Sequence, residues 1–167
     1  EPYRRQRQMC IRDRMNDTLE NNILMGDVGD AGEYLRQVCL KEEADAMEDG
    51  LQTKIGSSGV RLSGGQAQRL SLARTLCHKR PLLILDDPFS ALDQKTEREI
   101  FDKLKQNYPD TAILLISHRL YLFPEMDQVI WMEDGQATVS DHETLMRQIP
   151  EYAKFFAEQN GGSEYEA

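Results

Sequence analysis

Two short apolar runs, each followed at once by polar residues, constrain the fold of this chain most strongly. They are Leu82–Leu85 and Ile113–Ile116, and they lead into Asp86–Asp87 and Ser117–His118. Residues 94–107 between the runs follow a helical pattern. A strand, a helix and a second strand in this order predict a βαβ crossover. Runs this apolar are typical of a parallel sheet that is covered on both faces.

The sequence on either side of this unit predicts further helices and one hairpin. Asp134-Gly135 between two apolar segments is a strong hairpin signal. The predicted elements are one or two amphipathic helices over Tyr34–Met47, a helix that opens at Leu62-Ser63-Gly64-Gly65-Gln66 and ends at Lys79, strands over Val129–Met132 and Ala137–Val139, and helices from Asp141 onward. The predicted fold class is therefore α/β, with an acidic helical part, a parallel-sheet segment, and a C-terminal β-hairpin with helices.

Length and composition limit the classes of function. The 167 residues suffice for about one domain, and 20 basic against 29 acidic residues give a net charge of -9. This balance argues against a grip on nucleic-acid phosphates, so no nucleic-acid partner is expected. The three cysteines form no CxxC pair and suggest neither a disulfide framework nor a zinc site. No apolar run approaches the roughly 20 residues of a membrane-spanning helix.

The first fourteen residues, EPYRRQRQMCIRDR, differ from everything after them. They carry five arginines and show neither a helical nor a strand period. Their last six residues resemble translated sequencing-adaptor read-through. We therefore interpret 1–14 as a non-native segment and expect the folded protein to begin near Met15.

Asp86 and Asp87 form the first candidate site. Carboxylates at the carboxyl end of a buried parallel strand lie where open α/β sheets bind ligands. A hard oxygen ligand at such a position can hold Mg²⁺, usually through the waters of the metal. Asp86, directly after four apolar residues, fits this role. A loop or a helix cap is the structural alternative.

The sequence Leu62-Ser63-Gly64-Gly65-Gln66 forms a second candidate site, for an anion. Ser63 can cap the helix that follows, and the two glycines let backbone N–H groups approach phosphate oxygens. The N-terminus of the helix adds the positive end of its dipole. An ordinary N-cap with flexible glycines is the alternative.

Four motifs occur in one order: LSGGQAQRLSLARTL, LLILDDP, SALD and ISHR. They resemble the signature motif, the Walker B strand, the D-loop and the switch-histidine strand end of ATP-binding cassette (ABC) proteins. The resemblance covers nearly everything from Met15 to about Glu158. It implies a partial P-loop NTPase-like cassette in which two copies sandwich two ATP molecules head to tail. Each site then takes its Walker motifs from one cassette and LSGGQ from the other.

The resemblance also implies a role for each matching residue. Asp86 would hold Mg²⁺, Asp87 would occupy the position of the general base, and His118 would lie near the γ-phosphate, where a ring N–H donates to developing charge. The residues that would contact ATP are Leu62, Ser63, Gly64, Gly65, Gln66 and, in the D-loop, Asp93. Asp93 can cap the next helix at the same time. His78 and His142 lie in no such motif and are expected at the surface.

Two further stretches resemble the exporter class of the family. Residues 18–26 are similar to a T-x-x-E-N-I-x-x-G stretch, and residues 53–59, TKIGSSG, to the segment that touches the transmembrane coupling helices. Ser57 stands where the family usually has Glu, so this contact is expected to be weaker or differently made. A plain turn is the other interpretation of 53–59. The resemblance implies a transmembrane domain in the same full-length chain. It also implies that this cassette lies at the cytoplasmic face of the plasma or inner membrane.

The phosphate-binding motif GxxxxGK(S/T) does not occur in these residues. The preceding half of the cassette is expected to carry it, and the chain alone is expected to be inactive. The predicted division is a helical subdomain with the exporter-type loop and the signature helix over 15–80, the C-terminal part of the ATPase core over 81–160, and a frayed tail over 161–167.

Asp87 departs from the family pattern, because fully active cassettes usually carry Glu there. Asp holds its carboxylate one C–C bond, about 1.5 Å, further from the attacking water. The sequence therefore predicts slow hydrolysis at this cassette's own site. With an intact LSGGQ, the combination resembles the degenerate subunit of heterodimeric exporters, which completes the working site of its partner. A homodimer in which Asp87 works sluggishly is the alternative.

Two functions of other classes stay open at this point. The first is a soluble ABC ATPase that works on DNA or ribosomes, against which the acidic composition and the exporter-like stretches argue. The second is a non-hydrolysing regulatory cassette that dimerises on ATP. The transported substrate is not encoded in these residues.

Overall fold

The computed structural model describes residues 16–57, 59–78 and 80–160. The segment 1–14, the tail 161–167 and Lys79, the predicted helix end, lie outside the described residues. The chain divides into two compact units, Glu1–Ile116 and Ser117–Ala167.

The first unit begins with short elements whose ends are set by local hydrogen bonds. The elements are β1 (Asp17–Thr18), α1 (Leu19–Leu24), α2 (Ala31–Gln37), α3 (Lys41–Asp45), the 3₁₀-helix η1 (Gly50–Gln52) and β2 (Lys54–Ile55). Thr18 and Asp30 cap α1 and α2 by accepting backbone N–H groups. Cys39 takes a left-handed conformation, with φ 54°, between α2 and α3. The amphipathic segment Tyr34–Met47 therefore spans parts of two short helices.

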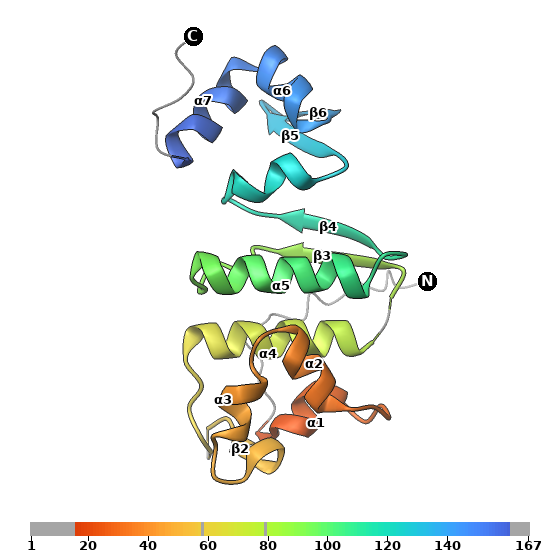
Figure 1. The fold of residues 1–167 in the computed structure, drawn as a ribbon, viewed down its shortest axis with the longest axis vertical. Helices are drawn as coiled ribbons and strands as arrows, with labels where there is room; N and C mark the ends of the chain where they lie inside the picture. Colours follow the sequence, from red (N-terminus) through yellow and green to blue (C-terminus); the bar gives the residue numbers. More distant parts are fainter. Residues whose placement is uncertain (1–15, 58, 79, 161–167) are drawn as a thin grey trace, which may run out of the picture. The chain divides into compact units, whose positions relative to one another are not determined.

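Helix α4 (Gly64–Cys77) is the longest helix before the sheet. Helices α1 and α2 pack against it, as Figure 1 shows. Its buried face includes Leu70, Ala73 and Leu76, which follow the spacing of one helical face. The same helix buries Arg74, which donates hydrogen bonds to Asn22 of α1.

The predicted βαβ unit is confirmed. It consists of β3 (Leu82–Asp86), α5 (Gln94–Asn107) and β4 (Ala112–Ile116), and the two strands pair in parallel with Leu82 opposite Ala112. Helices α4 and α5 lie on the same side of the strand pair (Figure 1). Ile100, Phe101 and Leu104 form the buried side of α5.

The expectation that the sheet is covered on both faces is wrong for the described residues. Leu83 and Leu85 are buried, whereas the alternate residues Leu82 and Ile84 are 51% and 59% exposed. Side chains alternate between the faces of a strand, so the exposed residues share the other face. The described strands form only a pair, and α4 and α5 supply a layer of helices on one side.

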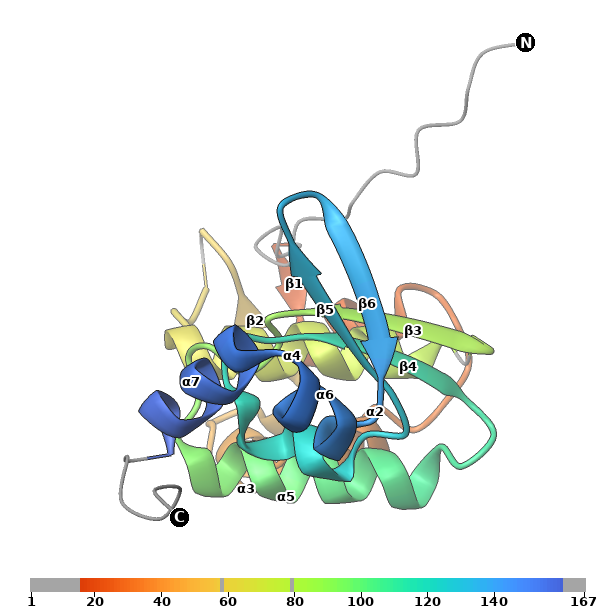
Figure 2. The same ribbon diagram turned by 90° about the horizontal axis from the view of Figure 1, so that it is seen from above.

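The described part of the second unit, residues 117–160, contains a hairpin and three helical segments. They are the 3₁₀-helix η2 (Leu120–Glu125), β5 (Val129–Glu133), β6 (Gln136–Ser140), α6 (His142–Gln148) and α7 (Pro150–Gln159). Asp134 and Gly135 both have positive φ, 46° and 77°, as a two-residue hairpin turn requires. The predicted hairpin is therefore confirmed, and Figure 2 shows its two long strands.

One apolar cluster holds the second unit together. Its buried members are Leu120, Val129, Leu145, Tyr152 and Phe156. The Trp131 ring meets the Tyr152 ring edge-on at 5.4 Å between centroids. Burial raises the pKa of Tyr152 to about 12. Within the part of the chain that the structure describes, no helix combines the length and the apolar character needed to cross a membrane.

Candidate functional site

The N-terminus of α4 is fixed by a reciprocal pair of hydrogen bonds. The Ser63 hydroxyl oxygen accepts the N–H of Gln66 at 3.1 Å, and the N–H of Ser63 donates to Gln66 Oε1 at 2.8 Å. This capping box sets the direction in which the helix begins. Leu62 is 7% exposed, so its side chain anchors the turn in the core.

Two backbone donors at this helix end make no hydrogen bond among the described residues. They are the N–H groups of Gly64 and Gly65, the first two residues of α4. Ser63 accepts with its oxygen and keeps its hydroxyl hydrogen for a further acceptor. Free N–H groups at the positive end of a 14-residue helix fit an anion such as a phosphate.

The side chain of Gln66 has partners within the chain. Its Nε2 donates to Glu43 of α3 at 2.8 Å, while its Oε1 serves the capping box. Arg69, one turn further along α4, forms an ion pair with the same Glu43 at 2.7 Å. These contacts attach α3 to the first turns of α4.

Asp86 and Asp87 lie where β3 ends. Asp86 is exposed and Asp87 is half-buried. The N–H of Asp87 donates to the carbonyl of Ile116 at 2.8 Å, which ties this residue to the end of β4. Asp87 has φ 45°, a left-handed conformation that is uncommon outside glycine and costs of order 1 kcal/mol or more.

Asp86 places one exposed carboxylate at the end of β3. No cluster of three or more His, Cys, Asp or Glu side chains that could hold a metal ion occurs among the described residues. Asp86 can supply one hard oxygen ligand, which suits Mg²⁺ because that ion is usually held by one or two carboxylates together with waters and substrate phosphates.

Asp93 caps α5, as the sequence suggested. Its Oδ1 accepts the N–H of Thr96 at 3.0 Å and its Oδ2 accepts the Thr96 hydroxyl at 2.7 Å. These bonds from Thr96 lower the pKa of Asp93, because they stabilise the charged carboxylate.

The side chain of Gln68 makes hydrogen bonds to the loop after β3 that the sequence did not predict. Its Nε2 donates to the carbonyl of Asp87 at 2.9 Å and to the Ser90 hydroxyl at 3.0 Å. Its Oε1 accepts the N–H of Ala91 at 2.9 Å. The only signal in the sequence is a second glutamine two residues after Gln66, and its partners lie 19 to 23 residues away.

His118 is exposed near the start of the second unit. Its carbonyl accepts a hydrogen bond from Gln159 Nε2, and its ring makes no hydrogen bond to the residues that the structure describes. The imidazole is therefore available to an external acceptor.

His142 and His78, both expected at the surface, are half-buried. The Nδ1 of His142 lies 2.7 Å from the Tyr152 hydroxyl, and its ring packs against Phe156 with 4.6 Å between centroids. Burial lowers the pKa of His142. His78 lies at the end of α4 with Nδ1 2.8 Å from a carboxylate oxygen of Asp27.

A family model described as ABC transporter matches residues 4–90, which is more than half of the chain. The chain belongs to the ABC transporter family. The match begins within the segment 1–14 that the sequence argument set aside, and it includes the signature residues and the carboxylates at the end of β3.

Exporters of the ABC family are among the similar proteins. The chain is 39% identical over 142 residues to an ATP-dependent lipid A-core flippase of Paraburkholderia xenovorans, covering 83% of this chain and 24% of the flippase. It is 36% identical over 151 residues to the glutathione/L-cysteine transport system ATP-binding/permease protein CydC of Bacillus subtilis, covering 87% and 27%. The chain thus spans about a quarter of the length of these curated relatives.

A solved structure supports the fold. The structure of a bacterial Atm1-family ABC exporter with ATP bound matches with a TM-score of 0.80 and 29% sequence identity, covering 87% of this chain and 27% of the exporter chain. The α/β arrangement described above is therefore the C-terminal part of an ABC cassette of the exporter type.

The two stretches that resemble ABC exporters lie side by side in the first unit. Strands β1 and β2 pair Thr18 with Lys54. The N–H of Leu19 donates to the carbonyl of Thr53 at 3.0 Å, and Gln52 Nε2 donates to Glu20 at 2.7 Å. Stretches that are far apart in the sequence therefore form one small surface.

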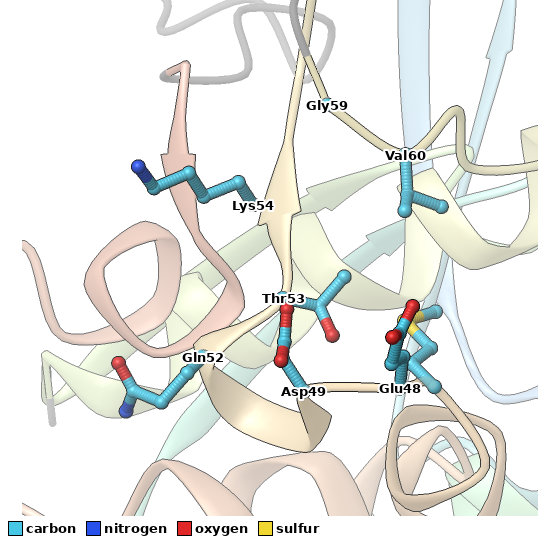
Figure 3. A pocket seen from close by; sticks show the side chains of 8 residues that line it. Glu48, Asp49, Gln52, Thr53, Lys54, Gly59 and Val60 are labelled. Carbon is cyan, nitrogen blue, oxygen red and sulfur yellow. The ribbon is translucent and has the colours of Figure 1, made fainter.

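A cavity of about 760 Å³ lies beside this surface. Figure 3 shows the carboxylates of Glu48 and Asp49 at the cavity and the Lys54 side chain extending away from them. Thr53 is 4% exposed, and its hydroxyl makes no hydrogen bond within the described residues. The cavity thus offers the acidic groups of Glu48 and Asp49 to a neighbour, while the Thr53 hydroxyl lies buried beneath it.

Proposed function

We propose that this chain is the C-terminal part of the nucleotide-binding cassette of an ABC exporter, and that the cassette powers transport by associating with a second cassette on ATP. The observation that carries this proposal is the N-terminus of α4, where Gly64 and Gly65 present two free N–H groups and Ser63 a free hydroxyl hydrogen. The similarity to exporters over more than four fifths of the chain supports the class.

In this proposal the residues of one cassette serve two nucleotides. Bound Mg²⁺–ATP supplies the phosphoanhydride bond whose cleavage drives the cycle. Ser63, Gly64 and Gly65 donate hydrogen bonds to phosphate oxygens of the ATP held by the partner cassette. Asp86 contributes an oxygen ligand toward Mg²⁺ on its own side. Leu62 and Gln66 support this turn from within the chain, through burial and the capping box.

Asp87 and His118 are proposed to act on the cassette's own nucleotide. Asp87 orients the attacking water as general base, and the exposed His118 ring donates to the γ-phosphate, where negative charge develops. Because the Asp side chain is one C–C bond shorter than Glu, we propose a slow site on this side and a heterodimeric partner that relies on the intact signature turn of this chain.

Replacing Asp87 by Glu in the full-length transporter tests this proposal. The substitution returns about 1.5 Å of reach, and a misplacement of about 1 Å can cost on the order of a hundredfold in rate. We expect the ATP hydrolysis rate at this cassette's own site, measured with the partner's site inactivated, to rise at least about tenfold. Asp86→Asn is the matched variant, and it should abolish hydrolysis at this site in the Asp87→Glu background. An unchanged rate in Asp87→Glu would show that Asp87 does not limit turnover.

An unchanged hydrolysis rate in Asp87→Glu would favour a non-hydrolysing regulatory cassette. The observation that supports this second function is the Asp at position 87. ATP-dependent association with the partner would then persist in Asp87→Glu while hydrolysis stays absent. Measuring both association and hydrolysis in the same preparation separates the two functions.

We also propose that the paired stretches around Thr18 and Thr53 contact a transmembrane domain, which places the cassette at the cytoplasmic face of the plasma or inner membrane. Support comes from their resemblance to exporter stretches, from the pairing of β1 with β2, and from the cavity in Figure 3. Ser57, at the position where the family usually has Glu, leaves this segment without one acidic contact. Selection of the transported substrate belongs to the membrane part.

A further inference from the structure

The segment between the carboxylates and α5 is attached to the signature helix by one side chain. Gln68 bonds to the carbonyl of Asp87 at 2.9 Å, the hydroxyl of Ser90 at 3.0 Å and the N–H of Ala91 at 2.9 Å. Its amide thus uses both donor hydrogens and one acceptor on a single loop. All these groups lie within the first unit.

The same loop touches the glycines of the signature turn. A Cβ atom placed on Gly65 would lie 3.0 Å from the carbonyl oxygen of Ala91 and 3.3 Å from a methyl of Leu92. One placed on Gly64 would lie 3.8 Å from the Cβ of Ala91. The loop therefore packs against the start of α4, independently of the Gln68 hydrogen bonds.

The backbone of Asp87 is held from two sides. Its N–H donates to Ile116 at 2.8 Å and its carbonyl accepts from Gln68, so both ends of a residue with φ 45° are fixed. A left-handed non-glycine residue persists only where its surroundings hold it in place. Without Gln68, the bonds that the Asp87 carbonyl retains from described residues come from Ser90. They are 3.3 Å long from the Ser90 hydroxyl and 3.4 Å long from its N–H.

We propose that Gln68 is a positioning residue for ATP hydrolysis, which couples the signature turn to Asp87 and to the loop at Ala91. The inference rests on the proposed function, in which the signature turn contacts the ATP of the partner cassette and Asp87 acts on the ATP of its own cassette. A nucleotide bound at Ser63 orders the start of α4, and Gln68, one turn further along, carries that order to the backbone of Asp87. Hydrolysis on one side thereby depends on occupancy of the other.

The test compares variants of Gln68 in the full-length transporter. Gln68→Met removes every hydrogen bond of the amide at similar length, and Gln68→Glu keeps an acceptor for Ala91 but loses the donor to Asp87. Thr75→Val is the matched control on the same helix, because among the described residues the Thr75 hydroxyl bonds the Ser71 carbonyl alone, at 3.0 Å. The readouts are kcat and KM for ATP at the Asp87 site, measured with the partner cassette's own site inactivated, together with amide hydrogen exchange of peptides that cover Ser90–Leu92.

We expect kcat to fall about tenfold in Gln68→Met and in Gln68→Glu, with KM for ATP within about twofold of the wild type. Exchange at Ala91 should speed up in Gln68→Met and stay slow in Gln68→Glu, while α4 keeps its protection in both. Thr75→Val should match the wild type in every readout.

If the wild-type transporter hydrolyses ATP, two results would overturn this inference and leave the proposed function intact. One is a Gln68→Met variant with kcat within about twofold of the wild type. The other is a loss of protection throughout α4, which would mark Gln68 as a structural residue only. A wild-type transporter that neither binds nor hydrolyses ATP would instead overturn the proposed function itself.

Discussion

Replacing Arg74 by Met should destabilise the contact between α1 and α4 by about 3–6 kcal/mol. Arg74 is 7% exposed, and burial lowers the pKa of its guanidinium without discharging it. Its Nε donates to the carbonyl of Asn22 at 2.6 Å, and one terminal nitrogen donates to Asn22 Oδ1 at 3.0 Å. Hydrogen bonds with a charged donor contribute about 1.5–3 kcal/mol each, and Met fills much of the same volume without replacing either bond.

Hydrogen exchange of α1 peptides in the full-length transporter measures this loss, because protection reports the free energy of local opening. At about 1.4 kcal/mol per factor of ten, the expected loss of protection is on the order of a hundredfold or more. A double-mutant cycle with Asn22→Ala isolates the bond to Oδ1 and should give a coupling energy of about 1.5–3 kcal/mol. Additive effects in the cycle, or a loss below about 1 kcal/mol in Arg74→Met, would refute the reasoning.

Two further predictions concern the cap of α4 and the half-buried His142. Ser63→Ala should cost about 1 kcal/mol of stability and weaken ATP-dependent association of the cassettes, whereas Ser63→Thr should retain both functions of the hydroxyl. Cross-linking of the dimer across an ATP titration checks this, and undiminished association in Ser63→Ala would count against the signature turn as an ATP contact. Burial lowers the pKa of His142 below its value in the unfolded chain, so the unfolded chain binds a proton more readily than the folded one. The free energy of unfolding is therefore unaffected by this residue above about pH 6.5 and decreases as the pH falls below it. The melting temperature should drop between pH 7.5 and 5.5 by more in the wild type than in His142→Gln, and equal drops would contradict the assignment.

The elements that sequence reasoning located correctly are those with local causes. The apolar runs of β3 and β4 and the helical pattern of α5 each show in a short window of sequence. The turn at Asp134-Gly135 follows from the conformations that these two residues tolerate. The cap at Asp93 likewise depends on a residue only three positions away.

The features that the sequence could not show depend on partners far along the chain. Gln66 looks like a ligand residue by its motif, yet its amide is engaged by Ser63 and by Glu43, the latter 23 residues away. The roles of Gln68 and Arg74 follow from contacts across 19 to 52 residues. Periodicity carries no information on such contacts, because exposed and bonded polar residues look alike in a helical pattern.

Polar side chains of α4 connect it to the elements around it. Gln66 and Arg69 hold α3, Gln68 holds the loop after β3, and Arg74 holds α1. A helix of 14 residues is about 21 Å long, and its internal hydrogen bonds make it move as one body.

The position of Arg74 gives this rigidity a functional consequence. Arg74 bonds the α1 residue Asn22, which belongs to the stretch that resembles exporters, while Ser63 stands at the opposite end of α4. A displacement of the helix by a ligand at Ser63 must therefore shift α1 or break the bonds to Asn22. Lys lacks the forked donors needed to hold both oxygens of Asn22, so Arg74→Lys should weaken the coupling between Ser63 and α1. We expect this variant to lower transport per ATP hydrolysed more than it lowers the rate of hydrolysis. Equal losses in transport and hydrolysis would show that α4 does not carry the signal to the exporter-type surface.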